Sequence, residues 1–253
     1  MKVKYSDLKN KRVFITGGGS GIGASIVEHF CEQGSEVYFV DINIKETNKL
    51  LKIIKKKRFR KPNFIECNLL DINKLEKIIK KIISTKGPIH ALVNSAANDD
   101  RHTTDQVDEK YWENRMAINL KHYFFAAKAV VKAMKKIKSG SIVNLSSVSW
   151  MLGEGDKVVY ETAKSAVVGL TRSFAQEYGK YNIRTNSVIP GSIATERQIK
   201  QWLTPKYKKL ILDSQALKRQ LKPNDVAQLV MFLASEQSSG CTKQSFVVDG
   251  GIT

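Results

Sequence analysis

The segment YETAK, residues 160–164, pairs a tyrosine with a lysine four positions later. In a helix, Tyr160 and Lys164 lie on the same face, one turn apart. An ammonium beside a phenol stabilises the phenolate, so we expect Lys164 to lower the pKa of Tyr160 from about 10 towards working pH. Such a phenolate acts as a general base on a substrate hydroxyl. Ser147 at the end of a predicted strand, and Asn119 at the start of the helix before it, distinguish this pair from a chance surface pair.

A glycine-rich turn, TGGGSGIG at residues 16–23, follows the first predicted strand and opens a helix. Glycines let the backbone turn sharply and approach a pyrophosphate, and the free N–H groups of the helix N-terminus attract the anion. Asp41 follows Gly23 by 18 residues, close to the spacing of about 20 that is typical of a ribose-binding acid. Its carboxylate can accept from both ribose hydroxyls and repels a 2′-phosphate, and no Lys or Arg follows it before Lys45. These features predict NAD, rather than NADP, as the cofactor.

Short apolar segments alternate with helical patterns along the whole chain. Seven segments are nearly continuous in apolar residues, as in buried parallel strands: residues 12–16, 36–40, 63–67, 89–94, 140–146, 184–190 and 244–249. Residues 71–84 and 160–178 repeat apolar positions at helical spacing. The alternation predicts one α/β domain over residues 1–253, built on a doubly wound parallel sheet with right-handed crossovers. Residues 195–222 are polar, helical and strandless, which predicts a substrate lid, with a plain surface excursion as the alternative.

The composition excludes several classes of protein. The chain has 253 residues, 42% of them hydrophobic and 26% charged, which is typical of a globular protein. Its three cysteines are far apart, so we expect neither a disulfide framework nor a zinc cluster, and we predict a cytoplasmic location. We expect no membrane helix and no secretory leader, because the chain has no long apolar run. The net charge of +18 would fit a nucleic-acid, membrane or acidic-protein partner, but the lysines are spread over many segments, which favours an ordinary enzyme with a basic surface.

The order and spacing of these motifs resemble the short-chain dehydrogenase/reductase family over essentially the whole chain. The motifs are TGGGSGIG (16–23), NSAA (94–97), Asn119, Ser147, YETAK (160–164) and PGSIAT (190–195). More closely, AANDDRH (96–102), INLKHYFF (118–125), VNLSSVSW (143–150), TERQ (195–198) and WLTP (202–205) resemble bacterial sugar dehydrogenases of the family. Those enzymes oxidise aldoses such as D-xylose, L-arabinose, L-fucose or D-galactose at C1. The resemblance implies a Rossmann-type sheet of about seven strands in the order 3-2-1-4-5-6-7.

The resemblance also implies a role for each matching residue. Tyr160 is the proton acceptor, Lys164 holds the nicotinamide ribose, Ser147 hydrogen-bonds the reacting oxygen, and Asn119 supports a water that links Lys164 to solvent. The residues expected to contact the cofactor are Gly17, Ser20, Gly21, Ile22, Gly23, Asp41, Asn68, Leu69, Asn94, Ser95, Ala96, Tyr160, Lys164, Pro190, Gly191, Ile193 and Thr195. Three residues depart from the family pattern. Asn68 replaces an aspartate beside the adenine and can still accept from its amino group. Ser95 replaces an asparagine and can still bond backbone but reaches less far, and Ala97 adds a methyl group where a close approach is expected, which leaves the local backbone shape undetermined.

The loop NDDRH, residues 98–102, follows the fourth predicted strand at the sheet edge where such folds bind ligands. It supplies an amide, two carboxylates, a guanidinium and an imidazole, which suits a polyhydroxy substrate; a solvated ion cluster is the alternative. The residues predicted to bind substrate are Asn98, Ser147, Trp150, Glu154, Tyr160 and Gln198. The histidines lack metal-ligand spacing, so we expect no metal site. We expect His102 to be structural and His29, His90 and His122 to lie on helix or strand surfaces.

Together these inferences lead to one expected function and two alternatives. We expect NAD-dependent oxidation of the C1 hydroxyl of a monosaccharide to an aldonolactone, with neither a membrane nor a nucleic-acid partner. A 3-oxoacyl-carrier-protein reductase would fit the basic surface, but such enzymes usually prefer NADPH, against Asp41. A non-enzymatic dinucleotide-sensing or nucleic-acid-binding protein would fit only the charge. The presence of Asn119, Ser147, Tyr160 and Lys164 together argues against it.

The resemblance implies a homotetramer as well. Helices over residues 119–138 and from Tyr160 onwards would pair across one interface, and residues 244–253 across another. The apolar helix face through Phe124, Phe125, Ala126, Ala129 and Val130 is large enough to need a cover.

Overall fold

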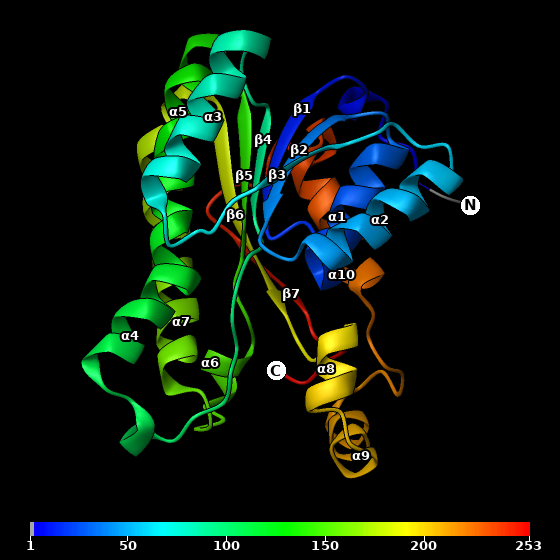
Figure 1. Ribbon diagram of the computed structural model, residues 1–253, viewed down its shortest axis with the longest axis vertical. Helices are drawn as coiled ribbons and strands as arrows, with labels where there is room; N and C mark the ends of the chain where they lie inside the picture. The colour runs from blue at the N-terminus through cyan, green and yellow to red at the C-terminus, as the bar shows by residue number, and fades with distance from the viewer. Residues whose placement is uncertain (1–2) are drawn as a thin grey trace.

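A computed structural model describes residues 3–253, so residues 1 and 2 of the predicted domain lie outside the description. A single seven-stranded sheet forms its centre (Figure 1). The strands are β1 (Arg12–Thr16), β2 (Glu36–Asp41), β3 (Asn63–Glu66), β4 (Ala91–Asn94), β5 (Gly140–Leu145), β6 (Ile183–Pro190) and β7 (Ser245–Val248). They lie in the order β3-β2-β1-β4-β5-β6-β7, and every neighbouring pair is parallel. The predicted sheet order is confirmed, and the predicted strand bounds differ by two residues at most.

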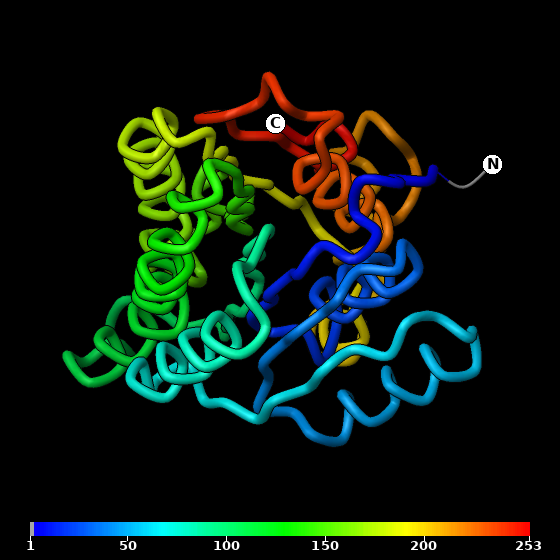
Figure 2. The backbone as a smooth tube through the Cα atoms, turned by 90° about the horizontal axis from the view of Figure 1, so that it is seen from above, coloured from blue at the N-terminus to red at the C-terminus, as the bar shows by residue number. Residues whose placement is uncertain are grey.

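Helices cover both faces of this sheet (Figures 1 and 2). On one face lie α1 (Gly21–Glu32), α2 (Ile44–Lys56) and α10 (Pro223–Ala234), and on the other α3 (Ile72–Lys86), α5 (His122–Ile137) and α7 (Val158–Tyr178). The shorter helices α4 (Glu109–Met116), α6 (Ser149–Leu152), α8 (Glu196–Gln201) and α9 (Pro205–Ser214) gather beyond the carboxyl ends of the strands, in the lower part of Figure 1. None of the helices in residues 3–253 has both the length and the apolar character of a membrane span.

Two apolar layers separate the sheet from its helices. Val13 and Ile15 of β1 face one layer and Phe14 faces the other, because successive side chains of a strand point to opposite faces. The first layer includes Ile26 of α1, and the second includes Ile79 of α3. The nearly continuous apolar character of the predicted strands therefore reflects burial on both faces.

The helical stretch that carries Asn119 differs from the prediction. Asn119 does not open a helix: it lies in a π-helical segment, Ala117–Lys121, between α4 and α5. Helical structure thus continues from residue 109 to residue 137. A π-helical turn forms when the backbone hydrogen bonds change locally from an i→i+4 to an i→i+5 spacing, and the residue types in this stretch do not specify that change.

Residues 195–222 fold as α8 and α9 with connecting turns, as their polar, strandless pattern predicts. An isolated bridge between Ile193 and Leu221 closes the base of this excursion. The side chains of Thr195 and Thr204 accept backbone N–H groups at the first turns of α8 and α9. Both helices therefore start at defined points beyond the carboxyl end of β6.

Gly23→Ala is expected to destabilise the fold, because a Cβ at this position would collide with the carbonyl oxygen of Gly17. A backbone oxygen cannot move aside without opening the glycine turn, so the free energy of unfolding should fall by about 1–3 kcal/mol. Urea unfolding followed by circular dichroism measures the change. Gly240→Ala is the control, since no heavy atom of the described residues beyond its own two chain neighbours lies within 4 Å of the added Cβ. Equal effects of the two substitutions would contradict the steric argument.

Candidate active site

The first turn of α7 carries Tyr160 and is attached to the loop after β4. The helix begins at Val158, and the N–H of Val159 donates to Nε2 of His102 at 3.3 Å. His102 is buried, and its Nδ1 lies 3.0 Å from the hydroxyl of Tyr111. The imidazole thus has the structural role predicted for it, as a cap on the helix that presents Tyr160.

The ammonium of Lys164 lies one turn further along α7, 5.6 Å from the ring centre of Tyr160. It is held by groups other than the Tyr160 hydroxyl: Nζ donates to Tyr123 Oη at 2.8 Å and to the carbonyl of Leu145 at 2.7 Å. Lys164 is 1% exposed, and burial lowers its pKa to about 7 because desolvation penalises the ammonium.

The electrostatics of Tyr160 differ from the prediction. Burial of the phenol raises the pKa of Tyr160, and the charge of Asp99 raises it further. The structure therefore contradicts the predicted lowering of the Tyr160 pKa towards working pH. Removing a phenolate from water costs more free energy than its interactions with the surrounding charges provide. The Lys164 ammonium donates a hydrogen bond to Tyr123 rather than to Tyr160.

Ser147 and Asn119 complete the cluster around these two residues. A hydrogen bond with Ser147 acts on Tyr160 in the direction that lowers the pKa of its phenol. Asn119 is fully buried and binds the backbone of Asn98 from both sides: the N–H of Asn98 donates to Oδ1 at 2.8 Å, and Nδ2 donates to the carbonyl of Asn98 at 3.0 Å. Asn119 therefore fixes the start of the loop that continues to His102.

The glycine turn forms a cradle without room for side chains. A Cβ on Gly17 would lie 2.6 Å from Cα of Ala96, and one on Gly18 would lie 2.7 Å from the ring of Phe39. Gly17 also has a φ of 68°, which favours glycine. The side chain of Ser20 makes no cap hydrogen bond at the start of α1, so it leaves the N–H groups of the first turn to another acceptor. This combination fits the pyrophosphate of a dinucleotide.

Asp41 lies at the end of β2, beside the cradle. Its Oδ2 accepts from the N–H of Gly19 and its Oδ1 from the N–H of Asn43, both at 2.8 Å. A carboxylate has about four acceptor positions, so acceptor capacity remains for ribose hydroxyls. The residues present therefore fit the adenosine half of the dinucleotide as well.

The other predicted cofactor residues border the same edge of the sheet. The N–H groups of Ser95 and Ala96 lie 3.1 and 3.4 Å from Thr16 Oγ1, directly over the cradle. Among the remainder, Ile22, Asn68, Gly191 and Thr195 are at least partly exposed, whereas Leu69, Asn94, Pro190 and Ile193 are buried. Ala97 is exposed and has no positive φ, so the alanine at this position is compatible with the backbone.

Hydrogen bonds and ion pairs connect the loop after β4 to the helical segment over residues 195–222. Gln198 Nε2 donates to Oδ2 of Asp99 at 2.5 Å, and Arg197 Nη2 lies 3.4 Å from the other oxygen of Asp99. The guanidinium of Arg101 stacks over the ring of Trp202 at 4.9 Å. Residues 195–222 are thus bound to the loop after β4, beyond the carboxyl ends of the strands, where the first turn of α7 also lies.

The other predicted substrate residues differ in their surroundings. Asn98 Oδ1 accepts from the N–H of Asp100 at 2.9 Å, which shapes the loop itself. The indole N–H of Trp150 is buried and has no hydrogen-bond partner among the described residues. The carboxylate of Glu154 forms an ion pair with Lys157, which reduces its capacity to bind a substrate.

Three carboxylates, Glu154, Asp156 and Glu161, have oxygens within 4.8 Å of one another. Lys157 forms ion pairs with Glu154 and Asp156, and Arg101 forms an ion pair with Asp156. These two cations offset part of the negative charge of the three carboxylates, so Glu154 and Asp156 belong to an ion-pair cluster.

Sequence reasoning missed Tyr123 and misplaced His122. Tyr123 follows Asn119 by four residues in one helical stretch, a spacing that could have pointed to a shared face. His122 is fully buried, so its predicted surface position is wrong. It faces Thr16, with Nε2 at 3.4 Å from Oγ1, and burial lowers the pKa of its imidazole to about 3.

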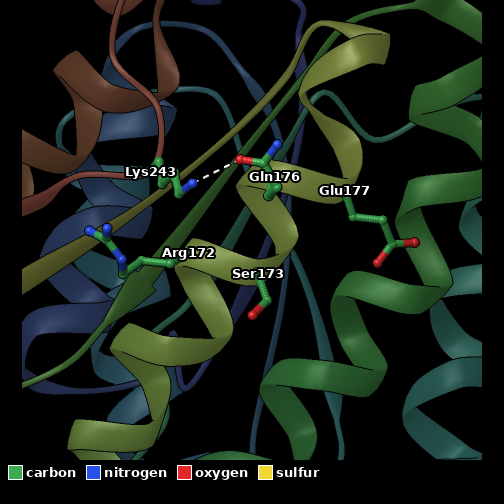
Figure 3. Close-up of a pocket in the computed structure, with 5 residues that line it drawn as sticks. All are labelled: Arg172, Ser173, Gln176, Glu177 and Lys243. Atoms are coloured by element: carbon green, nitrogen blue, oxygen red, sulfur yellow. Dashed lines mark hydrogen bonds between the residues drawn. The ribbon is translucent and has the colours of Figure 1, made fainter.

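A separate pocket lies near the other end of α7 (Figure 3). It is lined by Arg172, Ser173, Gln176 and Glu177 of α7 and by Lys243, which donates to Gln176 Oε1 at 2.8 Å. Its lining residues begin more than three helical turns beyond Tyr160 along α7, so the pocket is distinct from the cluster around that residue.

Comparisons with known proteins agree with this geometry. A family model described as enoyl-(acyl carrier protein) reductase matches residues 17–253. The chain is 38% identical over 249 residues to the probable galactose dehydrogenase GalD of Rhizobium meliloti (strain 1021), with 98% of this chain and 97% of that protein covered. It is 41% identical over 247 residues to the D-xylose 1-dehydrogenase of Caulobacter vibrioides (strain NA1000 / CB15N), with the same coverage.

Solved structures show the same architecture. The crystal structure of a putative short-chain alcohol dehydrogenase from Sinorhizobium meliloti 1021 matches with a TM-score of 0.91 at 27% identity, and the match covers 98% of each chain. The fold, the arrangement of Tyr160, Lys164, Ser147 and Asn119, and these relatives lead to one conclusion. The chain belongs to the short-chain dehydrogenase/reductase family.

Proposed function

We propose that this protein is an NAD-dependent dehydrogenase that oxidises the C1 hydroxyl of an aldose to an aldonolactone. The observation that carries the proposal is the cluster of Ser147, Tyr160 and Lys164, which combines a proton acceptor with a hydroxyl and a buried ammonium. Two relatives named for galactose and D-xylose, at 38% and 41% identity, support an aldose as the substrate.

The proposed mechanism uses Tyr160 as the general base. Its Oη takes the proton of the C1 hydroxyl, while Ser147 Oγ donates a hydrogen bond to the same oxygen. Bound NAD supplies the hydride acceptor and brings the positive charge of an oxidised nicotinamide ring. Loss of the proton from oxygen and of the hydride from C1 leaves the lactone carbonyl. Because Lys164 has three N–H donors and uses two of them on Tyr123 and Leu145, the third remains for the nicotinamide ribose.

The glycine cradle and Asp41 would hold the other half of the cofactor. Gly17, Gly21 and Gly23 give the pyrophosphate close access to the start of α1, and Asp41 accepts from the adenosine ribose. The carboxylate of Asp41 disfavours a 2′-phosphate, which supports NAD over NADP and weighs against a 3-oxoacyl-carrier-protein reductase. The remaining residues named above for cofactor contact are proposed in the same roles.

A polyhydroxy substrate would lie between Tyr160 and residues 195–222, which we propose to act as a lid. The unpartnered indole N–H of Trp150 and the amide of Gln198 offer polar contacts on two sides. The bonds from Gln198 and Arg197 to Asp99 connect the proposed lid to the loop after β4.

We also propose a cytoplasmic homotetramer without a nucleic-acid partner. Cys31, Cys67 and Cys241 are free thiols, which agrees with a reducing compartment. On α5, Phe124 is 42% exposed, whereas Ala126 and Val130 are buried in the core of the subunit. The apolar face that a second copy could cover is therefore narrower than the sequence indicates.

Tyr160→Phe should lower turnover by at least about 10²-fold, because it removes the proton acceptor and keeps the ring. NAD should still bind, because the glycine cradle and Asp41 are unchanged. Aldose oxidation followed by NADH absorbance, with NAD binding by calorimetry, measures both effects. Tyr178→Phe, at the far end of α7, is the matched control and should keep wild-type turnover. A folded Tyr160→Phe protein with near wild-type turnover would falsify the mechanism.

Asp41→Ser should change the cofactor preference. Loss of charge-assisted hydrogen bonds to the ribose should raise the KM for NAD by about 10- to 100-fold. The kcat/KM for NADP should be higher than in the wild type, because the carboxylate that repels the 2′-phosphate is gone. Steady-state kinetics with both cofactors measures the ratio, and Asp105→Ser, at an exposed aspartate outside the cradle, should leave it unchanged. Equal use of NAD and NADP by the wild type would show that Asp41 does not have this role.

Light scattering at micromolar concentration should give about four times the subunit mass, as dihedral tetramers are common closed assemblies. Phe124→Glu should shift the mass downwards, because it adds a charge to the exposed part of α5. Asn48→Glu, at an exposed position of α2 on the other face of the sheet, adds the same charge outside the proposed interfaces and is the control. A stable wild-type monomer would contradict the tetramer.

A further inference from the structure

The carboxylate of Asp99 lies between two parts of the candidate site. It follows Asn98, whose backbone is bound on both sides by Asn119. On its other side it accepts from Gln198 at 2.5 Å and pairs with Arg197 at 3.4 Å. Asp99 is therefore positioned from the sheet side by Asn119 and from the lid side by α8.

The neighbouring Asp100 is of the same residue type but has different surroundings. Its Oδ1 lies 2.5 Å from Arg197 and its Oδ2 lies 3.0 Å from Arg115, so two guanidinium groups compensate its charge. Asp99 has one guanidinium, at a longer distance, and one neutral amide. Of about four acceptor positions on the Asp99 carboxylate, two remain for hydroxyl donors.

The charge of Asp99 acts on both reacting side chains. It raises the pKa of Tyr160, and it raises the pKa of Lys164 against the lowering effect of burial. The other groups that act on Tyr160 are Glu154, which raises the pKa of its phenol, and Ser147 and Arg197, which lower it. Among these charged groups, Asp99 has the largest effect on the pKa of the Tyr160 phenol, as expected for a carboxylate close to the reacting atoms.

We propose that Asp99 determines substrate specificity: its carboxylate accepts hydrogen bonds from substrate hydroxyls next to the reacting carbon and is held in place by Gln198 and Arg197. The inference rests on the proposed aldose oxidation and names the residue that recognises the sugar. A carboxylate here favours neutral polyols, which donate to it, over anionic substrates, which it repels. It also disfavours alcohols without further hydroxyls, since these leave the charge desolvated and without a donor.

Asp99→Asn tests the recognition of hydroxyls. Replacing the carboxylate by a neutral amide should lower kcat/KM for aldoses by about 10- to 100-fold, the range expected for loss of a hydrogen bond to a charged group. For cyclohexanol, which has a single hydroxyl, kcat/KM should be unchanged or higher. Asp100→Asn is the matched control, because it removes an adjacent carboxylate that shares Arg197. It should leave the preference for aldoses over cyclohexanol as in the wild type.

The pH dependence provides a second readout that a purely structural role would not change. Asp99 disfavours the phenolate of Tyr160 and favours the ammonium of Lys164, so its neutralisation lowers both pKa values. The pH profile of kcat should therefore move to lower pH in Asp99→Asn and stay in place in Asp100→Asn. Asp99→Glu retains the charge, so it should keep the wild-type pH profile. It should still lower kcat/KM for aldoses, because the longer side chain displaces the carboxylate oxygens from the substrate hydroxyls.

The outcomes separate this inference from the proposed function. If the wild type oxidises no aldose with NAD, the proposed function fails and the inference fails with it. If the wild type oxidises aldoses and Asp99→Asn retains both the aldose preference and the pH profile, only the inference is overturned. It is also overturned if Asp100→Asn causes the same changes. Should Asp99→Asn not fold, an unchanged aldose kcat/KM in Asp99→Glu would overturn it as well.

Discussion

An ammonium group that is almost completely removed from water must replace its hydration by hydrogen bonds within the protein. Lys164 meets this requirement with Tyr123 Oη and the carbonyl of Leu145. Leu145 ends β5, and Tyr123 lies in the first turn of α5. An uncompensated buried charge costs several kcal/mol, so β5, α5 and α7 must stay in register around this one nitrogen. The positions of Tyr160 and Ser147 follow from that register.

The same desolvation makes the site sensitive to each nearby charge. Fields act more strongly in a buried environment than in water, so a single carboxylate such as Asp99 affects both Tyr160 and Lys164. The solvent-exposed lysines of α2 are screened by water and salt. The charges that shift the pKa values of Tyr160 and Lys164 are those of Asp99, Glu154 and Arg197. The net charge of +18 therefore says little about the chemistry, whereas the few charges at the carboxyl edge of the sheet govern it.

Two backbone arrangements connect the parts of this edge that we propose to bind the cofactor and the substrate. The glycine turn packs so closely against Ala96 and Phe39 that side chains are excluded at Gly17 and Gly18. The π-helical segment turns Asn119 towards the backbone of Asn98. As a result, the end of β4 passes over the cradle, and the loop that follows it reaches α7 and α8 from a fixed starting point.

The sequence by itself determined the sheet, its strand order through the family resemblance, and the residue types at the site. Strand and helix periodicities are local properties, and motifs such as YETAK combine chemistry and spacing within a few residues. Only the tertiary structure decided how these groups act on one another. One partner of Lys164 is Tyr123 from another helix, and the buried His122 faces Thr16 of β1. Asp99 is held in part by Gln198 of α8, almost a hundred residues later. Desolvation and electrostatic coupling depend on what surrounds a group in space, and neither can be read from neighbouring residues in the chain.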